Sequence, residues 1–165
     1  MDKIIPDREL LLSRIEYNPE TGLFWRKSGL GGVRLDKPAG CIKRDGYVYL
    51  SLNHTVYSGH RLAYFFVEGF FPDFVDHING VKSDNRWCNL REATFNQNNY
   101  NRGYRSDNTS GFKGVSLHKK SGRWAAQIMV NKKNLYLGLF DCPKEAHEAY
   151  CKAADKYHGE YSNYG

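Results

Sequence analysis

The spacing of apolar positions predicts short, alternating elements in the N-terminal part of the chain. Residues 7–16 have a helical period, 23–26 and 46–52 are typical of strands, and 60–68 again follow a helical period. The letters YNPETG at 17–22 predict a turn, and a second turn is expected near 53–54. Glycines at 29, 31 and 32 indicate irregular chain. The inward side chains of the two helices are expected to be Leu10, Leu11, Ile15, Leu62, Ala63, Phe65 and Phe66.

The C-terminal part predicts a sheet and one helix. Strands are expected at 113–118, 123–130 and 134–140, and a helix at 143–157, which begins with Pro143 at a position where its missing N–H does no harm. Strand alternation predicts an inner face of Trp124, Ala126, Ile128 and Val130. The helix is expected to cover that face with Ala146, Ala149, Tyr150, Ala153 and Tyr157.

Between these parts, residues 74–102 are polar and contain too few aliphatic side chains to form a core of their own. Residues 103–110 are polar and contain glycine, which is typical of a linker. We therefore expect an α+β protein with a domain at 1–102, a linker at 103–110 and a domain at 111–165.

Composition narrows the choice of function. Hydrophobic residues make up 41% of the chain and aromatic residues 15%, which argues against wholesale disorder. The net charge is +6, and residues 101–123 hold six basic side chains and one acidic one, an arrangement that suits a polyanion. The first twelve residues are charged, and no stretch is long enough to span a membrane, so an intracellular protein is expected. In that setting Cys41, Cys88, Cys142 and Cys151 are interpreted as reduced, buried thiols.

One constellation has the residue types for phosphodiester hydrolysis. Asp76 and His77 precede an Asn-Gly turn, Asn89 follows within DNRWCNLR, and Asn98 follows Thr94, which can cap a short helix. A neutral histidine can take a proton from water. Carboxylate and carboxamide oxygens suit Mg²⁺, and Asn89 could fix the histidine tautomer by accepting from its second N–H.

The run HRLAYFFVEGFFPDFVDHINGVKSDNRWCNLREATFNQNNYN resembles the HNH motif of phage and intron homing endonucleases. Its D-H-I-N-G and D-N-R-x-x-N-L-R segments match in order and spacing, and the similarity extends over roughly residues 7–102. The resemblance implies a ββα-metal motif at about 74–102. In that motif Asp76 and Asn98 would bind one divalent ion, Mg²⁺ or alternatively Mn²⁺; His77 would be the general base, and Asn89 would orient it. Many relatives have a final histidine where this chain has Asn98.

The C-terminal residues resemble the plant APETALA/ethylene-response-factor DNA-binding domain, through FKGV, SGRWAAQI, LYLGLF and EAHEAYxxAA. The resemblance implies a three-stranded antiparallel sheet packed on one helix, with the opposite face of the sheet in a DNA groove. On that face and the loops beside it we expect DNA contacts from Lys113, Ser116, His118, Lys120, Arg123, Gln127, Met129, Asn134 and Tyr136. Candidate phosphate contacts elsewhere are Arg61, Arg86, Arg91, Arg102 and Arg105.

Together these features predict a site-directed endonuclease for double-stranded DNA, most simply a homing endonuclease. It would be monomeric, without a membrane or protein partner, and would act in the bacterial cytoplasm if phage-encoded. Two alternatives stay open: a DNA-binding regulator with a vestigial HNH motif, and a phage nuclease of low specificity. His60 is either a structural residue at a helix start or a phosphate contact. His54, His118, His147 and His158 are expected at the surface, and Lys119, Lys120, Lys132 and Lys133 are either solvated or in contact with phosphate.

Overall fold

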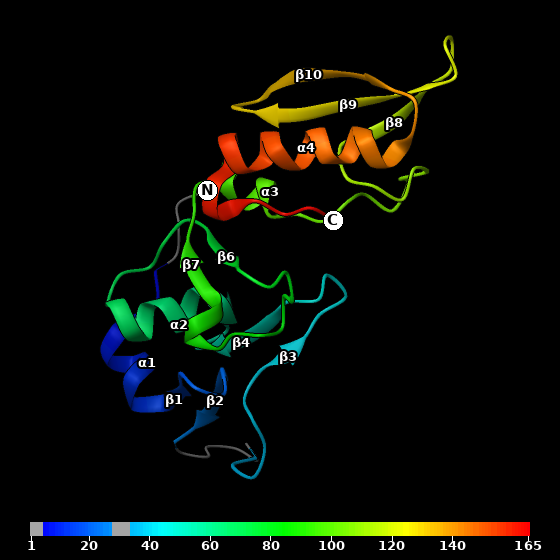
Figure 1. Ribbon diagram of the computed structural model, residues 1–165. Coiled ribbons are helices and arrows are strands. Elements are labelled where there is room, and N and C mark those ends of the chain that lie inside the picture. Colours follow the sequence, from blue (N-terminus) through cyan, green and yellow to red (C-terminus); the bar gives the residue numbers. More distant parts are fainter. Residues whose placement is uncertain (1–4, 28–33) are drawn as a thin grey trace. The chain divides into compact units, whose positions relative to one another are not determined.

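The computed structural model describes residues 5–27 and 34–165, so the glycines at 29, 31 and 32 lie outside the described residues. It is an α+β protein with small antiparallel sheets, as expected. The chain forms two compact units, residues 1–92 and 93–165 (Figure 1).

The first unit begins with a helix and a hairpin. Helix α1 (Arg8–Arg14) is capped by Asp7, whose carboxylate accepts from Leu10 N, and strands β1 (Ile15–Asn18) and β2 (Leu23–Arg26) pair antiparallel. The predicted turn is shorter than expected, because its first two residues, Tyr17 and Asn18, extend β1 and pair with Phe24 and Leu23.

The second layer of this unit is the sheet β3 (Cys41–Ile42), β4 (Val48–Leu52) and β5 (Thr55–Ser58), followed by α2 (Gly59–Glu68). The two-residue turn between β4 and β5 uses left-handed backbone at Asn53 and His54. A shared core joins α1, β2, β4 and α2, with Leu11, Ile15, Phe24, Leu50 and Leu62 each at most 1% exposed. Leu10 and Phe66 are only partly buried and pack against this core from its edge.

The unit ends with a two-stranded sheet. Strand β6 (Val75–His77) pairs antiparallel with β7 (Leu90–Glu92), in the register Val75 with Glu92, Asp76 with Arg91, and His77 with Leu90. A loop joins the strands and contains the short 3₁₀ helix η1 (Trp87–Asn89). Val75, Asp76 and His77 are all buried, so the polar pair lies inside the unit rather than at its surface.

The second unit contains the predicted sheet and helix. Strands β8 (Val115–His118), β9 (Arg123–Val130) and β10 (Lys133–Phe140) have the order β10-β9-β8, and α4 (Pro143–His158) lies along one face (Figure 1). Ala126 and Ile128 are buried against α4. Ala126 clusters with Ala146, and Ile128 clusters with Tyr150, Ala153 and Ala154. Tyr157 is 41% exposed, because a helix of this pitch brings Ala154 and His158 to the sheet instead.

Helix α3 (Phe95–Tyr100) also belongs to the second unit. Thr94 and Gln97 form a reciprocal capping box at its start. At its end Tyr100 stacks on His158, with ring centroids 3.8 Å apart, and clusters with Ala93 and Tyr161 of the 3₁₀ helix η2 (Gly159–Tyr161). The surface position expected for His158 is therefore wrong, since its side chain is buried and bonded to Met129 O. The packing boundary lies at 92/93, ahead of the expected domain end at 102.

The residues expected as a linker form bonded turns next to the sheet. Asn108 Nδ2 donates to Phe112 O, Asn108 Oδ1 accepts from Gly111 N, and Ser110 Oγ donates to Val115 O. Asn101, just before them, is buried, and its carbonyl oxygen accepts from Asn163 Nδ2. Residues 101–112 are thus tied to the sheet and to the C-terminal segment of their own unit.

All four cysteines are unpaired, as expected, but Cys41 and Cys88 are exposed rather than buried. His147 also differs from its expected surface position, because it is partly buried and its Nδ1 lies 3.2 Å from Lys113 O. Among the described residues, none of the helices combines the length and the apolarity that a membrane span requires.

Candidate functional site

Asp76 is held at the centre of the β6–β7 sheet by a charged partner on the facing strand. Arg91, its register partner, places Nε at 2.9 Å and Nη2 at 2.7 Å from Asp76 Oδ2. The side chain of Asp76 is 5% exposed and that of Arg91 is 15% exposed. Burying a carboxylate is costly unless it is paired. Arg91 therefore orients the Asp76 carboxylate, and the phosphate contact expected of Arg91 stays a prediction.

His77 is bonded through one ring nitrogen to a side chain that the sequence analysis did not single out. Nε2 lies 3.2 Å from Asn85 Oδ1. Because that oxygen can only accept, the proton sits on Nε2 and the lone pair on Nδ1. Burial lowers the pKa of His77 from its usual value, so the ring is neutral near pH 7. The arrangement is that of an imidazole prepared to take a proton.

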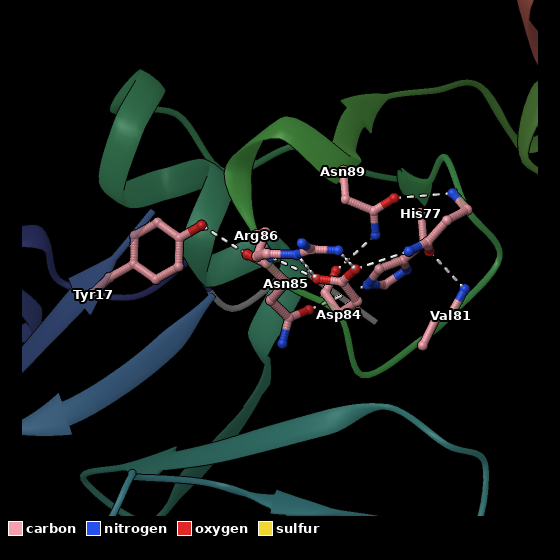
Figure 2. A network of polar contacts seen from close by, with 8 residues as sticks. Tyr17, His77, Val81, Asp84, Asn85, Arg86 and Asn89 are labelled. Atoms are coloured by element: carbon pink, nitrogen blue, oxygen red, sulfur yellow. Dashed lines mark hydrogen bonds and ion pairs between the residues drawn. The ribbon is translucent and has the colours of Figure 1, made fainter. Parts of the chain in front are cut away.

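Asn89 does not have the contact expected of it. Its Oδ1 accepts from Asn79 N at 2.9 Å, and its Nδ2 donates to Asp84 O at 2.8 Å (Figure 2). Both bonds are to the backbone of the loop between β6 and β7, which also closes on itself through Ile78 N and Asn89 O. Asn89 therefore holds the loop that surrounds His77, and the fixing of the tautomer falls to Asn85.

The N-terminal hairpin places Asn85. Tyr17 Oη donates to Asn85 O at 2.7 Å, as Figure 2 shows, and Trp87 N donates to Pro19 O at 2.8 Å. Gly22, at φ +72°, lies so close that a Cβ there would be 2.4 Å from Arg86 N. The turn after β1 is thus packed directly on the backbone around Asn85. The D-N-R segment contained the signal for this residue, but nothing in the sequence distinguishes its role from that of Asn89.

Two further rings lie against His77. The centroid of the His60 ring is 5.1 Å away in an edge-to-face arrangement, and that of Tyr47 is 5.8 Å away. Tyr47 also contacts His60, with centroids 5.1 Å apart, and lies beneath Lys82 Nζ. Burial, followed by the nearby His77, lowers the pKa of His60 to about 3, so this ring also stays neutral.

The other arginines expected to contact phosphate differ in what they bind. Arg61 Nε donates to Pro72 O and its guanidinium covers the Phe71 ring, so it holds the turn after α2. Arg86 forms a two-point ion pair with Asp84, which lowers the pKa of that carboxyl. In the second unit Arg102 and Arg105 are exposed, and Arg105 pairs with Asp107. Of these, Arg86, Arg102 and Arg105 lie at the surface.

The outer face of the β8–β10 sheet agrees with the expected pattern. Gln127 pairs with Tyr136, Met129 with Asn134, and His118 with Arg123, so each pair shares a face. Arg123 also bonds to Asp141 across the edge of the sheet, and His118 Nδ1 lies 2.7 Å from Ser121 Oγ. The exposed members of this outer face and its loop are Ser116, His118, Lys120, Arg123, Gln127, Met129, Asn134 and Tyr136.

Lys113 is the exception among the residues expected on that face. Its Nζ donates to Tyr100 O at 2.8 Å and to Asn163 O at 2.9 Å, and its side chain is partly buried. Burial lowers the pKa of Lys113 to about 8. Its ammonium group joins α3 to the C-terminal segment inside the unit, and the DNA contact expected of Lys113 stays a prediction.

The metal ligand set proposed from the resemblance is divided between the two units. Among the residues that the structure describes, no three His, Cys, Asp or Glu side chains are grouped to hold a metal ion. The proposed ligands, Asp76 and Asn98, are one carboxylate and one carboxamide, so they would not count as a group of this kind. Asp76, oriented by Arg91, offers the hard carboxylate oxygens that Mg²⁺ prefers. Asn98 lies on α3 of the second unit, and its pairing with Asp76 stays a prediction.

Comparison with protein families also divides the chain in two, but its boundary falls between residues 100 and 110 rather than at 92/93. The family model described as HNH endonuclease matches residues 57–100, and the model described as AP2 domain matches residues 110–160. The chain carries both domains. The HNH match indicates a nuclease, and the AP2 match indicates DNA binding. No solved structure matches the chain.

The curated relatives align with the AP2 domain. APETALA2-like protein 2 of Oryza sativa subsp. japonica is 49% identical over 53 residues, which cover 31% of this chain and 12% of that protein. The AP2-like ethylene-responsive transcription factor AIL5 of Arabidopsis thaliana is 45% identical over 56 residues, covering 33% of this chain and 10% of its own length. The chain thus spans about a tenth of the length of the curated relatives it matches.

Proposed function

We propose that this protein is a metal-dependent DNA endonuclease whose HNH domain cuts and whose AP2 domain binds the duplex. The observation that carries the proposal is the state of His77. It is a neutral, buried imidazole with its proton fixed on Nε2 by Asn85, next to a carboxylate that is paired with Arg91. A general base for water needs this combination of protonation state and fixed orientation. A structural histidine in a small core would need neither the adjacent carboxylate nor the arginine paired with it.

The reaction proposed is hydrolysis of a phosphodiester. His77 Nδ1 takes a proton from water, whose oxygen forms a bond to phosphorus while the bond to the 3′ oxygen breaks. The leaving oxygen takes a proton from solvent, so the products are a 3′ hydroxyl and a 5′ phosphate. Asn85 keeps the lone pair of the neutral ring on Nδ1 until that atom takes the proton, and Asn89 keeps the surrounding loop closed.

The residues of this chain that would hold a divalent ion are Asp76 and Asn98. When bound, Mg²⁺ or Mn²⁺ would neutralise charge on the phosphate and on the leaving oxygen. Asp76 fits that role by its chemistry, because it offers carboxylate oxygens that Arg91 holds in one orientation. Arg91 would be a positioning residue, acting on the metal through the carboxylate.

DNA binding is assigned to the exposed face of the β8–β10 sheet. Polar side chains there can contact base edges, and the basic ones at its border can contact phosphates. The absence of Lys113 from this set weakens the basic character of one end, which leaves Lys120 and Arg123 as the cations at the β8–β9 end. The finer proposal is a site-directed enzyme, most simply a homing endonuclease.

The test is nicking of supercoiled plasmid by the full chain, with and without Mg²⁺ or Mn²⁺, beside His77→Ala. We expect metal-dependent nicking by the parent protein and a loss of about a hundred- to ten-thousand-fold in the variant, with DNA binding retained. Full activity in EDTA would remove the metal mechanism. DNA binding without nicking in either metal would favour the second candidate, a regulator, to which the transcription factors among the AP2 relatives point.

A further inference from the structure

His60 is the second imidazole of the first unit that lies in the interior next to the proposed general base. It is the second residue of α2, and its ring meets the His77 ring edge-to-face at 5.1 Å between centroids. The start of the same helix also approaches Asn85, since a Cβ on Gly59 would lie 3.0 Å from Asn85 Nδ2. The backbone that carries His60 is therefore in contact with both members of the His77–Asn85 pair.

The two nitrogens of His60 are in different surroundings. Nδ1 is fully covered and has no hydrogen-bond partner among the described residues, whereas the side chain as a whole is only partly buried. Nε2 of His60 is not among the fully covered atoms without a partner. A neutral ring with its proton on Nε2 would therefore carry its N–H donor on the nitrogen that is less enclosed.

The position of His60 beside His77 determines which part of a bound phosphate its Nε2–H could contact. Under the proposed function, a phosphate attacked by a water on His77 would come near the His60 ring, because the two ring centroids are 5.1 Å apart. Tyr47 packs on both rings and fixes the angle between them. Burial lowers the pKa of His60 to about 3, so it remains a neutral donor throughout the working range of the base. It neither takes nor gives a proton in the reaction.

We propose that His60 is a catalytic residue whose Nε2–H donates a hydrogen bond to a non-bridging oxygen of the phosphate attacked by the water on His77. The inference rests on the proposed function and adds a residue to that site. The competing explanation is that His60 is an aromatic spacer between Tyr47 and His77. The two differ in what must be preserved: the donor in the first case, the ring in the second.

The experiment compares His60→Phe, which keeps a flat ring and removes the donor, with His60→Gln, which keeps an N–H donor and removes the ring. His54→Asn is the matched control, because His54 is exposed in a left-handed turn that asparagine tolerates. Cleavage of plasmid by the full chain is measured as kcat and KM, together with the thermal midpoint of each protein. His60→Asn is a second donor variant, for use where the glutamine does not fold.

We expect His60→Phe to melt near the parent protein, to keep KM within about threefold and to lose about a hundred- to a thousandfold in kcat, the usual effect of removing one transition-state donor. His60→Gln should recover at least tenfold over His60→Phe. A phenylalanine variant within fivefold of the parent kcat overturns the inference, as does a folded donor variant with no recovery. If the parent itself cuts nothing in Mg²⁺ or Mn²⁺, the proposed function fails. If His77→Ala is inactive but His60→Phe is active, only this inference fails.

Discussion

Both units contain buried polar side chains, but the two sets bond to different partners. In the first unit Asp76 and His77 bond to the side chains of Arg91 and Asn85. In the second, Lys113 and His158 bond to backbone carbonyl oxygens of Tyr100, Asn163 and Met129. Both kinds of bond orient the side chain, and a carbonyl that accepts from an imidazole fixes its tautomer as a carboxamide oxygen does. A bond to a carbonyl also ties the side chain to the path of the backbone.

The difference teaches how to separate site residues from structural ones when both are buried. Burial and a lowered pKa are common to His77, His158 and Lys113, so neither property by itself identifies a site. The kind of hydrogen-bond partner, a side chain or a backbone atom, separates the site residues more clearly. By this criterion Asn89, whose carboxamide bonds only to backbone atoms, belongs with the structural residues although it lies beside His77.

The largest effect is expected from a fragment that lacks the residues of the second unit that hold α3 in place. A fragment of residues 1–102 keeps every group named in the proposed chemistry, but it loses His158, Tyr161, Lys113 and Asn131, which hold Tyr100. Helix α3 has six residues, and isolated helices below about 12–15 residues are marginal in water. We expect the fragment to melt cooperatively through its own core and to lose metal-dependent nicking. Parental nicking by the fragment would show that α3 does not depend on the AP2 domain.

Within the first unit, Asn85→Leu tests whether the tautomer contact matters. Leucine is close in size but cannot accept from His77 Nε2, so the proton is free to move to Nδ1 and block the base. Outer groups of this kind typically change activity by about 10- to 100-fold. The measurement is the cleavage rate at saturating metal, with Asn89→Leu as the comparison. Asn85→Asp and Asn85→Gln keep an acceptor oxygen, so these variants should retain more activity than Asn85→Leu.

The hairpin that places Asn85 can be tested through two glycines with nearly the same backbone. Gly22 and Gly80 have φ of +72° and +74°, but a Cβ meets Arg86 N at 2.4 Å only in the first case, and nothing within 4 Å in the second. Gly80→Ala should therefore cost about 1 kcal/mol of unfolding free energy, and Gly22→Ala about 1–3 kcal/mol more. Urea denaturation measures both. Equal losses would mean that the turn does not press on the Asn85 backbone.

In the second unit, Lys113→Met should lower the unfolding free energy by about 1–3 kcal/mol at pH 7, because two carbonyl oxygens lose their donor. Lys119→Met, at an exposed position, is the control and should change little. The folded-state pKa of Lys113, about 8, is below its ordinary value of 10.5, so the unfolded chain holds the proton more tightly. Stability attributable to Lys113 should thus rise between about pH 8 and pH 10.5. DNA affinity unchanged in Lys113→Met would agree with its internal position.

Local pattern predicted most of the elements, since α1, α2, α4 and the strands β8–β10 follow directly from the spacing of apolar residues. It could not predict β3 or β5, which are short and have no alternation of their own. The Asp76–His77 pair was visible in sequence because its residue types are unusual together. The roles of Asn85 and Lys113 were not, because each depends on a contact with a residue far away in sequence, Tyr17 and Asn163 respectively.

The place of α3 has a consequence for how such chains can be recombined. The HNH family match extends through residue 100, whereas the packed unit that holds α3 begins at Ala93. A chimera that exchanges the AP2 domain after residue 100, where the HNH match ends, would separate α3 from Tyr161, His158 and Lys113. A junction at 92/93 would instead transfer α3, with Asn98, together with the new AP2 domain. A change of DNA target, made in the laboratory or by gene exchange, would then work best when the new AP2 domain is transferred with its own α3.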